Sequence, residues 1–206
     1  MTFGKRLMDL GLVLCLSVFL ILPIVIIAVI ILLRDGRPVF YKSQRMKTPE
    51  QSFTLWKFRT MTPEASDASV SAAYKDDKIT PLGRALRHRR LDELPQLWNI
   101  FVGDMSFVGP RPPLPRFVEL CPDLYARVLQ NRPGVTGLAT LMYHRKEEAI
   151  LSRCHTADQT DETYLRRCVP IKARIDLIWA RHRSVCYDFV LVFQTAARVF
   201  GPRDHK

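Results

Sequence analysis

The stretch LGLVLCLSVFLILPIVIIAVIILL, residues 10–33, carries no charged side chain over 24 positions. As a straight α-helix rising about 1.5 Å per residue it would reach roughly 36 Å. A bilayer hydrocarbon core is about 30 Å thick, so the stretch is long enough to cross it. It also exceeds the apolar region of a signal peptide, which spans about 7 to 15 residues, and no small-residue cleavage site follows it. We therefore expect residues 1–36 to form a retained membrane segment.

Two features predict that this segment turns back instead of crossing the bilayer. Pro23 lies in its middle, where it removes one backbone hydrogen bond and favours a kink. Basic residues flank both ends, with Lys5 and Arg6 before the apolar run and Arg34 and Arg37 after it. Because basic flanks tend to stay in the cytoplasm, the pattern favours a re-entrant helix-break-helix with both ends on the cytoplasmic face. A single-pass anchor kinked at Pro23 is the alternative.

Residues 37–206 are long enough for one cytosolic, membrane-associated catalytic domain, which we expect to be α+β and mainly helical. The chain of 206 residues has a formal net charge of +11, which fits an anionic partner such as lipid headgroups, nucleic acid or phosphorylated substrates. Its five cysteines include no C-x-x-C pair, so neither a zinc site nor a disulfide framework is indicated. We interpret them as reduced thiols.

Residue patterns predict short strands, short helices and apolar helices that can lie at the membrane surface. Thr80 followed by Pro81 is typical of a helix start, and we expect that helix to end near Arg90 and a second one to run from Asp92 to about Val102. The other expected elements are strands at 39–41 and 52–61 joined by a turn at 47–50, a mobile loop at 62–77, helices at 115–120 and 123–130, a turn at 133–137 entering a strand to about 142, a helix at 161–181 interrupted at Pro170, and a largely apolar helix at 188–198.

The adjacent carboxylates Asp92 and Glu93 are the strongest chemical signal in the sequence. At a helix N-terminus, free amides and the helix dipole would keep both ionised. One carboxylate can then attack phosphorus while the other holds a hard divalent cation. Four arginines precede the pair, at positions 84, 87, 89 and 90. The cluster therefore suggests a phosphate-reaction centre.

Lys57 and Arg59 share one face of the second expected strand, because side chains two apart point the same way. That face is either a phosphate contact or a solvated edge of the sheet.

Four ordered motifs resemble one family: FRTM at 58–61, LDELPQLWN at 91–99, GDMSFVGPRP at 103–112 and RPGVTG at 132–137. Together they look like the bacterial sugar transferases, the monotopic phosphoglycosyl transferases. The resemblance runs from the N-terminal apolar segment to the region around residues 183–188, which is nearly the whole chain. One departure concerns the membrane segment, which in the family often breaks at Ser-Pro whereas this chain has Leu22-Pro23.

The resemblance implies an enzyme on the cytoplasmic face of the bacterial inner membrane. It would transfer a phosphosugar from a UDP-sugar to polyprenol (undecaprenyl) phosphate with Mg²⁺, release UMP, and so begin glycoconjugate assembly. It also implies that Asp92 is the nucleophile of a covalent intermediate, that Glu93 is a metal ligand, and that Pro110, Arg111 and Pro112 lie near the nucleotide. The substrate-binding residues expected overall are Lys57, Arg59, Arg87, Pro110, Arg111 and Pro112.

Three other functions are alternatives to this one. A nucleic-acid binder fits the net charge but not the apolar run, and the chain has no recognition motif, so no nucleic-acid partner is expected. A non-enzymatic membrane-tethered scaffold explains the apolar run but not the carboxylates and arginines. A metal-dependent sugar-nucleotide pyrophosphatase would use the same carboxylates to activate water.

Overall fold

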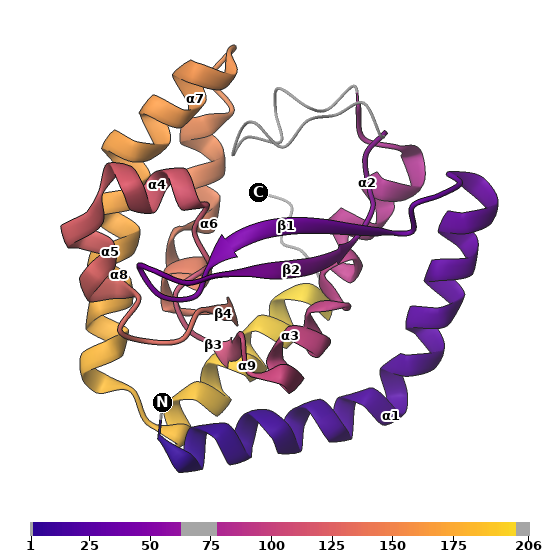
Figure 1. Ribbon diagram of the computed structural model, residues 1–206, viewed down its shortest axis with the longest axis horizontal. Helices are drawn as coiled ribbons and strands as arrows, with labels where there is room; N and C mark the ends of the chain where they lie inside the picture. Colours follow the sequence, from indigo (N-terminus) through magenta and orange to yellow (C-terminus); the bar gives the residue numbers. More distant parts are fainter. Residues whose placement is uncertain (1, 63–77, 201–206) are drawn as a thin grey trace.

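The computed structural model describes residues 2–62 and 78–200, and most of the expected loop at 62–77 lies outside these residues. The fold is mainly helical with short strands, as predicted (Figure 1). The elements are α1 (Phe3–Arg34), β1 (Phe40–Met46), β2 (Ser52–Phe58), α2 (Pro81–His88), the 3₁₀ turn η2 (Leu91–Glu93), α3 (Gln96–Val102), β3 (Ser106–Val108), α4 (Pro115–Leu120), α5 (Pro122–Val128), β4 (Gly134–Thr136), α6 (Leu138–Leu151), α7 (Ala157–Thr163), the π-helical turn η3 (Tyr164–Cys168), α8 (Val169–His182) and α9 (Val185–Phe200).

The apolar N-terminal segment is one helix, α1, that bends sharply along its length (Figure 1). Pro23 lies inside it and has no N–H to donate to the carbonyl of Phe19, which accounts for a bend. The predicted break is thus wrong in one respect, because the helix bends without being interrupted. Within the described residues α1 alone is long and apolar enough to cross a membrane, and almost none of its most apolar stretch is buried.

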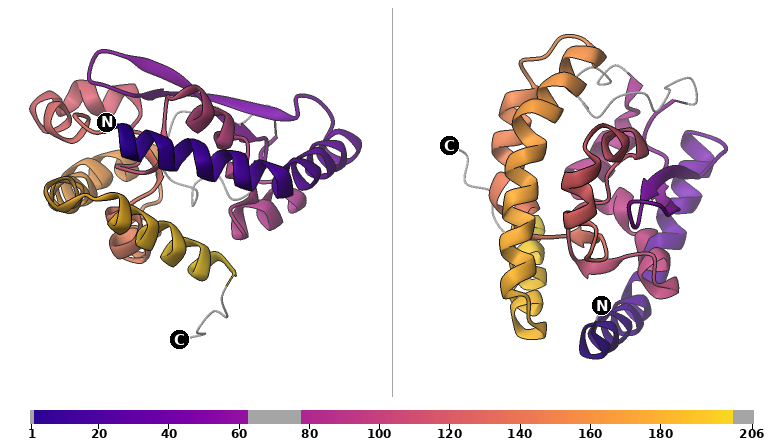
Figure 2. Two further views of the ribbon diagram at one scale, coloured as in Figure 1. Left: turned by 90° about the horizontal axis from the view of Figure 1, so that it is seen from below. Right: turned by 60° about the vertical axis from the view of Figure 1, so that its left-hand side comes forward.

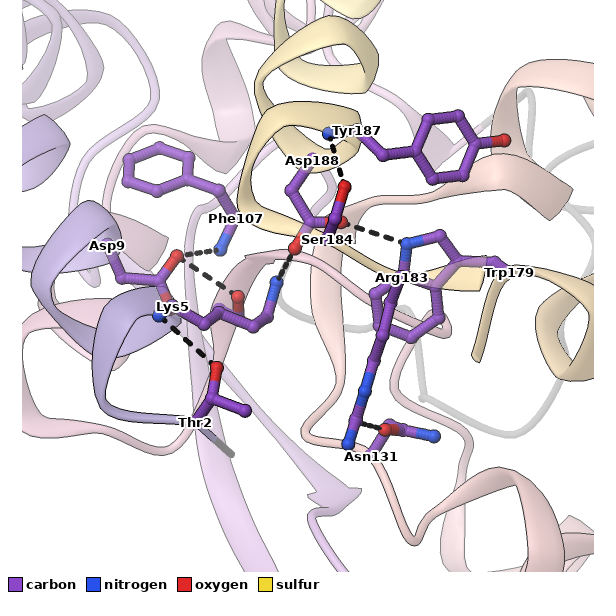
Figure 3. A network of polar contacts seen from close by, with 11 residues as sticks. Thr2, Lys5, Asp9, Phe107, Asn131, Trp179, Arg183, Ser184, Tyr187 and Asp188 are labelled. Carbon is purple, nitrogen blue, oxygen red and sulfur yellow. Dashed lines mark hydrogen bonds and ion pairs between the residues drawn. The ribbon is translucent and has the colours of Figure 1, made fainter. Parts of the chain in front are cut away.

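The N-terminal end of α1 is held to the rest of the protein by buried polar contacts, shown in Figure 3. Lys5 forms an ion pair with Asp188 of α9, and both side chains are almost fully buried. The other carboxylate oxygen of Asp188 accepts a hydrogen bond from Trp179 Nε1 at 2.9 Å. One turn further along α1, Asp9 Oδ1 accepts a hydrogen bond from the backbone N–H of Phe107 at 3.1 Å. The N-terminal end of α1 is therefore attached to the domain by buried charged side chains.

The C-terminal end of α1 is held by Arg59, whose guanidinium donates hydrogen bonds to the three carbonyl oxygens that follow the helix. Its Nη2 lies 2.5 Å from the oxygen of Asp35 and 2.8 Å from that of Gly36, and its Nη1 lies 3.2 Å from that of Arg37. Thr80 Oγ1 donates to the Asp35 carboxylate at 2.8 Å. Both ends of α1 are therefore fixed on the same domain.

The strands form two separate pairs. β1 and β2 are an antiparallel hairpin in which Phe40 pairs with Phe58 and Met46 with Ser52. β1 is thus longer than the strand expected at 39–41, because pairing with β2 extends it through polar residues that have no strand signal of their own, while β2 ends before residue 61. β3 and β4 are a short parallel pair.

The main core lies where α1, β2, α3, β3, α6, α8 and α9 meet. In the left view of Figure 2, the hairpin lies on one side of α1 and α9 on the other. The buried residues of this cluster are Val13, Phe53, Leu55, Ile100, Met105, Phe107, Val108, Leu141, Trp179 and Leu191. The cluster joins segments that are far apart in the sequence, from Val13 to Leu191, so it fixes the hairpin and the helices relative to one another.

Two elements differ from the sequence predictions around this core. The strand expected up to residue 142 is instead the helix α6, which places Leu141 in the main core and Tyr143 and Leu151 in a neighbouring cluster. Tertiary packing therefore overrides the strand-like composition of this stretch. The interruption expected at Pro170 takes the form of the π-helical turn η3, which ends at Cys168, and Pro170 itself lies in the first turn of α8.

Helix α2 packs against bare backbone, which yields a stability prediction. A Cβ on Gly83 would lie 2.1 Å from the carbonyl oxygen of Thr60. We expect Gly83→Ala to lower the free energy of unfolding by about 1 to 3 kcal/mol, because α2 must move away from the backbone at Thr60. The measurement is thermal unfolding of the detergent-solubilised protein by circular dichroism.

The matched control is Gly11→Ala, also inside a helix, where a Cβ would have no atom within 4 Å. It should leave stability unchanged or raise it, because alanine is the better helix former by about 1 kcal/mol. Equal unfolding temperatures for the two variants would contradict the close approach of α2.

Candidate active site

A cavity of about 630 Å³ opens between the β1–β2 hairpin, α2 and η2 on one side and α6, η3 and α8 on another. Its volume is in the range of ligand-binding pockets, roughly 300 to 1,000 Å³. Four cations that line it come from segments near the carboxylates: Lys57, Arg87, Arg90 and Arg111. The cavity is therefore suited to a ligand with several negative charges.

Asp92 and Glu93 lie at this cavity on the 3₁₀ turn η2, each with 8% of its surface exposed. The turn follows Arg90, whose backbone is left-handed with φ of 55°. The expectation that one helix runs from Asp92 to Val102 is wrong, because α3 begins only at Gln96. Pro95 has no N–H to continue a helical bond pattern from η2, so the chain makes tighter turns before α3 starts.

Glu93 is held by two cations from different segments. Lys57 Nζ of β2 lies 3.0 Å from Glu93 Oε1, and Arg111 Nη2 lies 2.7 Å from the same oxygen. Burial opposes ionisation of this carboxylate, but Arg111, Lys57 and Arg90 outweigh it and hold the pKa of Glu93 well below its usual range. Oε2 of Glu93 is buried and has no hydrogen-bond partner among the described residues.

The pKa of Asp92 is shifted in the opposite direction to that of Glu93. Burial raises the pKa of Asp92 above its usual value, although Lys57, Arg87 and Arg111 partly oppose the rise. Glu93 adds to the rise, because a like charge next to Asp92 disfavours its ionisation. The direction of this shift is opposite to the one expected for a carboxylate at a helix N-terminus, and Asp92 lies on the single 3₁₀ turn η2, not at the start of a longer helix. A raised pKa makes the ionised carboxylate more basic, and so a better nucleophile once ionised, which is the kind of perturbation found at functional sites.

The structure brings together most of the residues expected to bind substrate. Lys57, Arg59, Arg87, Arg111 and Pro112 all line the cavity. Arg59 does so while its guanidinium holds the chain after α1. Arg87 Nε donates to the hydroxyl of Thr60 at 2.8 Å, which steadies the guanidinium beside the cavity.

Pro110 is not among the residues that line the main cavity, unlike Arg111 and Pro112 of the same loop. It lines a smaller adjacent cavity, and its carbonyl oxygen accepts a hydrogen bond from Gly134 N at 2.9 Å. Pro110 thus ties the loop after β3 to β4 and so holds Arg111 in position.

Comparison with known proteins gives the family of the chain. The family model of bacterial sugar transferases matches residues 1–202. The chain belongs to the bacterial sugar transferase family. All four motifs and the whole of the cavity as described lie inside the matched range.

Several relatives of this bacterial sugar transferase have informative names. It is 40% identical over 141 residues to the sugar transferase EpsL of Bacillus subtilis, covering 66% of this chain and 67% of EpsL. It is 36% identical over 201 residues to the UDP-glucose:undecaprenyl-phosphate glucose-1-phosphate transferase of Klebsiella pneumoniae, covering 95% of this chain but 40% of that protein. It is 32% identical over 215 residues to the exopolysaccharide production protein ExoY of Rhizobium meliloti, covering 95% of this chain and 85% of ExoY.

Sequence reasoning missed one wall of the cavity in this sugar transferase. It consists of side chains from α6, η3 and α8: Thr140, His144, Glu147, Glu148, Tyr164 and Lys172. Of these, Thr140 falls in the strand expected up to about residue 142, and no element was predicted for the stretch that carries His144, Glu147 and Glu148, so their common face was not recognised. The signal was present, because positions 140, 144, 147 and 148 follow the spacing of one helical face.

The two carboxylates alone supply only some of the ligands that a magnesium ion needs. The described residues contain no group of three or more histidine, cysteine, aspartate or glutamate side chains that could hold a metal. Protein sites for Mg²⁺ at phosphates, however, use one or two carboxylates and take the other ligands from the substrate and water. The unpartnered Oε2 of Glu93, next to Asp92, is a hard oxygen donor of this kind. The residues present therefore fit Mg²⁺ bound together with a phosphate substrate.

Proposed function

We propose that this protein transfers a phosphosugar from a UDP-sugar to polyprenol (undecaprenyl) phosphate and releases UMP. The observation that carries the proposal is the carboxylate pair in a cationic cavity. Glu93 is tied there to Lys57 and Arg111, whereas Asp92 forms no such ion pair within the part of the chain that the structure describes. The names of relatives that act on undecaprenyl phosphate support the same reaction.

In the proposed first step, an Asp92 carboxylate oxygen attacks the phosphorus that bears the sugar. A bond forms from that oxygen to phosphorus, the bond from phosphorus to the bridging oxygen breaks, and UMP leaves with the bonding electrons. In the second step an oxygen of the lipid phosphate attacks the same phosphorus. The aspartyl bond then breaks, which restores the Asp92 carboxylate and gives polyprenol diphosphate sugar.

The division of roles follows from the contacts of the two carboxylates. Glu93 is fixed by two cations, so its attack on phosphorus would require it to give up both. Asp92 is destabilised as an anion by burial, so bonding to phosphorus relieves that cost. Lys57, Arg87 and Arg111 would hold the diphosphate and stabilise negative charge as UMP departs.

Glu93, through Oε2, would hold Mg²⁺ together with the substrate phosphates. When bound there, the ion neutralises phosphate charge.

The membrane position follows from α1, and we propose a re-entrant segment on the cytoplasmic face of the inner membrane. One end of α1 is fixed by Lys5 to α9, and the other by Arg59 at residues 35–37. A helix that crossed the bilayer would separate its two ends by about 30 Å of hydrocarbon. Contact of both ends with one domain supports entry and exit on the same face, where the lipid phosphate is reached.

Apolar surface on other elements supports the same position. Trp98 and Phe101 of α3 and Phe193 of α9 are exposed, as is most of the apolar stretch of α1. Helices α3 and α9 both pack on α1, so these side chains would meet lipid next to it. Basic residues would add attraction to anionic lipids.

The covalent step is tested without the lipid acceptor. The protein is mixed with a UDP-sugar labelled in the sugar, and intact mass and peptide mapping follow. We expect a phosphosugar adduct on Asp92 and a burst of UMP equal to the enzyme, both absent in Asp92→Asn. Asp104→Asn is the matched control, because Asp104 pairs with Lys47 and does not line the cavity.

Substrate binding with neither adduct nor UMP burst would instead indicate direct attack by the lipid phosphate in a ternary complex. Steady UMP and sugar phosphate release without lipid acceptor would indicate hydrolysis and a pyrophosphatase.

Metal dependence is tested by chelation. Excess EDTA should abolish turnover and added Mg²⁺ should restore it, because the phosphate charges need a hard cation. Glu93→Gln should raise the Mg²⁺ concentration needed for half-maximal rate or remove activity. Glu162→Gln, on an exposed face of α7, should behave as the unmodified protein. Full turnover in excess chelator would disprove the magnesium proposal.

The topology is tested by labelling with a membrane-impermeant maleimide in a background where the exposed Cys15 and Cys186 are serine. Thr2→Cys and Lys146→Cys should both be protected in intact cells and labelled after permeabilisation. Pro23→Ala restores a helical hydrogen bond and should shift Thr2→Cys towards periplasmic labelling. Periplasmic labelling of Thr2→Cys with Pro23 intact would exclude the re-entrant segment.

A further inference from the structure

One face of α6 forms a polar wall of the cavity to which the proposed chemistry assigns no part. Thr140, His144, Glu147 and Glu148 all line the cavity from this helix. They follow one another at helical spacing, so a hydroxyl, an imidazole and two carboxylates stand in a row on one face. Burial, and then the charge of Arg90, lower the pKa of His144, which favours a neutral imidazole that can both donate and accept hydrogen bonds.

Glu147 is the fixed point of this wall. Lys172 Nζ of α8 lies 2.9 Å from Glu147 Oε1 and 3.3 Å from Tyr164 Oη. Lys172 is 9% exposed, and 17% of the Glu147 side chain is exposed. Burying such a pair costs desolvation energy, which its attraction repays only with good geometry and further hydrogen bonds such as the one from Lys172 to Tyr164. A carboxylate has two oxygens, so one can be held by Lys172 while the other accepts hydrogen bonds from a ligand.

The charge of this wall limits which part of a UDP-sugar it can bind. Two carboxylates repel the diphosphate, for which Lys57, Arg87 and Arg111 provide cations elsewhere in the same cavity. Ionised carboxylates only accept hydrogen bonds, so their ligand must offer donors. The uridine offers the uracil N–H and two ribose hydroxyls, whereas a hexose offers a larger set of hydroxyls, each of which both donates and accepts. The sugar is therefore the better match to the row.

We infer that the α6 face, with Glu147 positioned by Lys172, binds the hydroxyls of the donor sugar and determines which sugar is accepted. The inference rests on the proposed function and names the part of the cavity that distinguishes one UDP-sugar from another. Glu147 contacts the substrate in this arrangement, and Lys172 is a positioning residue.

The test compares donors with and without the sugar. In an Asp92→Asn background, which prevents turnover, affinities for UDP-glucose, UDP-galactose, UDP-N-acetylgalactosamine and UDP are measured by calorimetry. Glu147→Gln should weaken binding of the preferred UDP-sugar roughly 10- to 100-fold, the range for hydrogen bonds to a charged group. UDP affinity should change less than about twofold, and its retention shows that the variant is folded.

Two further variants separate positioning from general damage. Lys172→Met should reduce discrimination between the sugars, seen as a smaller ratio of kcat/KM values in the otherwise unmodified enzyme. Glu162→Gln makes the same chemical change on an exposed helix and should alter neither affinity.

The outcomes are distinct. Equal weakening of UDP and UDP-sugar by Glu147→Gln would place the nucleotide on α6 and overturn the inference, as would unchanged affinity for every ligand. In both cases transfer by the unmodified enzyme would leave the proposed function standing. If the unmodified enzyme transferred no phosphosugar from any of the three donors, the proposed function itself would fail, and the inference with it.

Discussion

The attachment of both ends of one apolar helix to a single domain is the constraint on which the structure depends. Lys5 and Asp188 bury opposite charges at one end, and Arg59 binds three backbone carbonyls at the other. Breaking a buried ion pair typically costs about 3 to 5 kcal/mol, so this attachment is not easily released. The bend that Pro23 permits in α1 lets the helix meet both attachment points. The cavity thus lies on the same domain as both membrane-facing ends.

The same device, a buried charge satisfied from a distant segment, organises the cavity. Glu93 joins β2 through Lys57 and the loop after β3 through Arg111, so three segments meet at one carboxylate oxygen. Glu147, Lys172 and Tyr164 join α6, α8 and η3 in a similar way. Asp92 has neither of these fixed pairings, and burial raises its pKa. Neighbouring carboxylates therefore differ because of what they touch and not because of their chemistry.

Local signals predicted much of the fold correctly. Thr80 accepts a hydrogen bond from Gly83 N at 2.9 Å and caps α2, and Pro170 lies in the first turn of α8, directly after the π-helical turn η3. These features depend on the backbone chemistry of single residues, which is independent of the rest of the chain. The start of α3 and the first turn of α6 were predicted wrongly, and the rest of α6 was not predicted. Their conformations depend on Pro95 joining two turns and on Leu141 packing into a core made of distant segments.

The sequence by itself determined the apolar segment, the carboxylate pair, the arginine-rich surroundings and the family, because each is a matter of composition or of short motifs. Only the tertiary structure decided that Lys57 and Arg111 hold Glu93 and leave Asp92 less stable as an anion. It also decided that α6 contributes Glu147 to the cavity, more than 50 residues away from Asp92 along the chain. Burial and pairing arise only when segments distant in sequence are packed together, and local patterns do not contain that information.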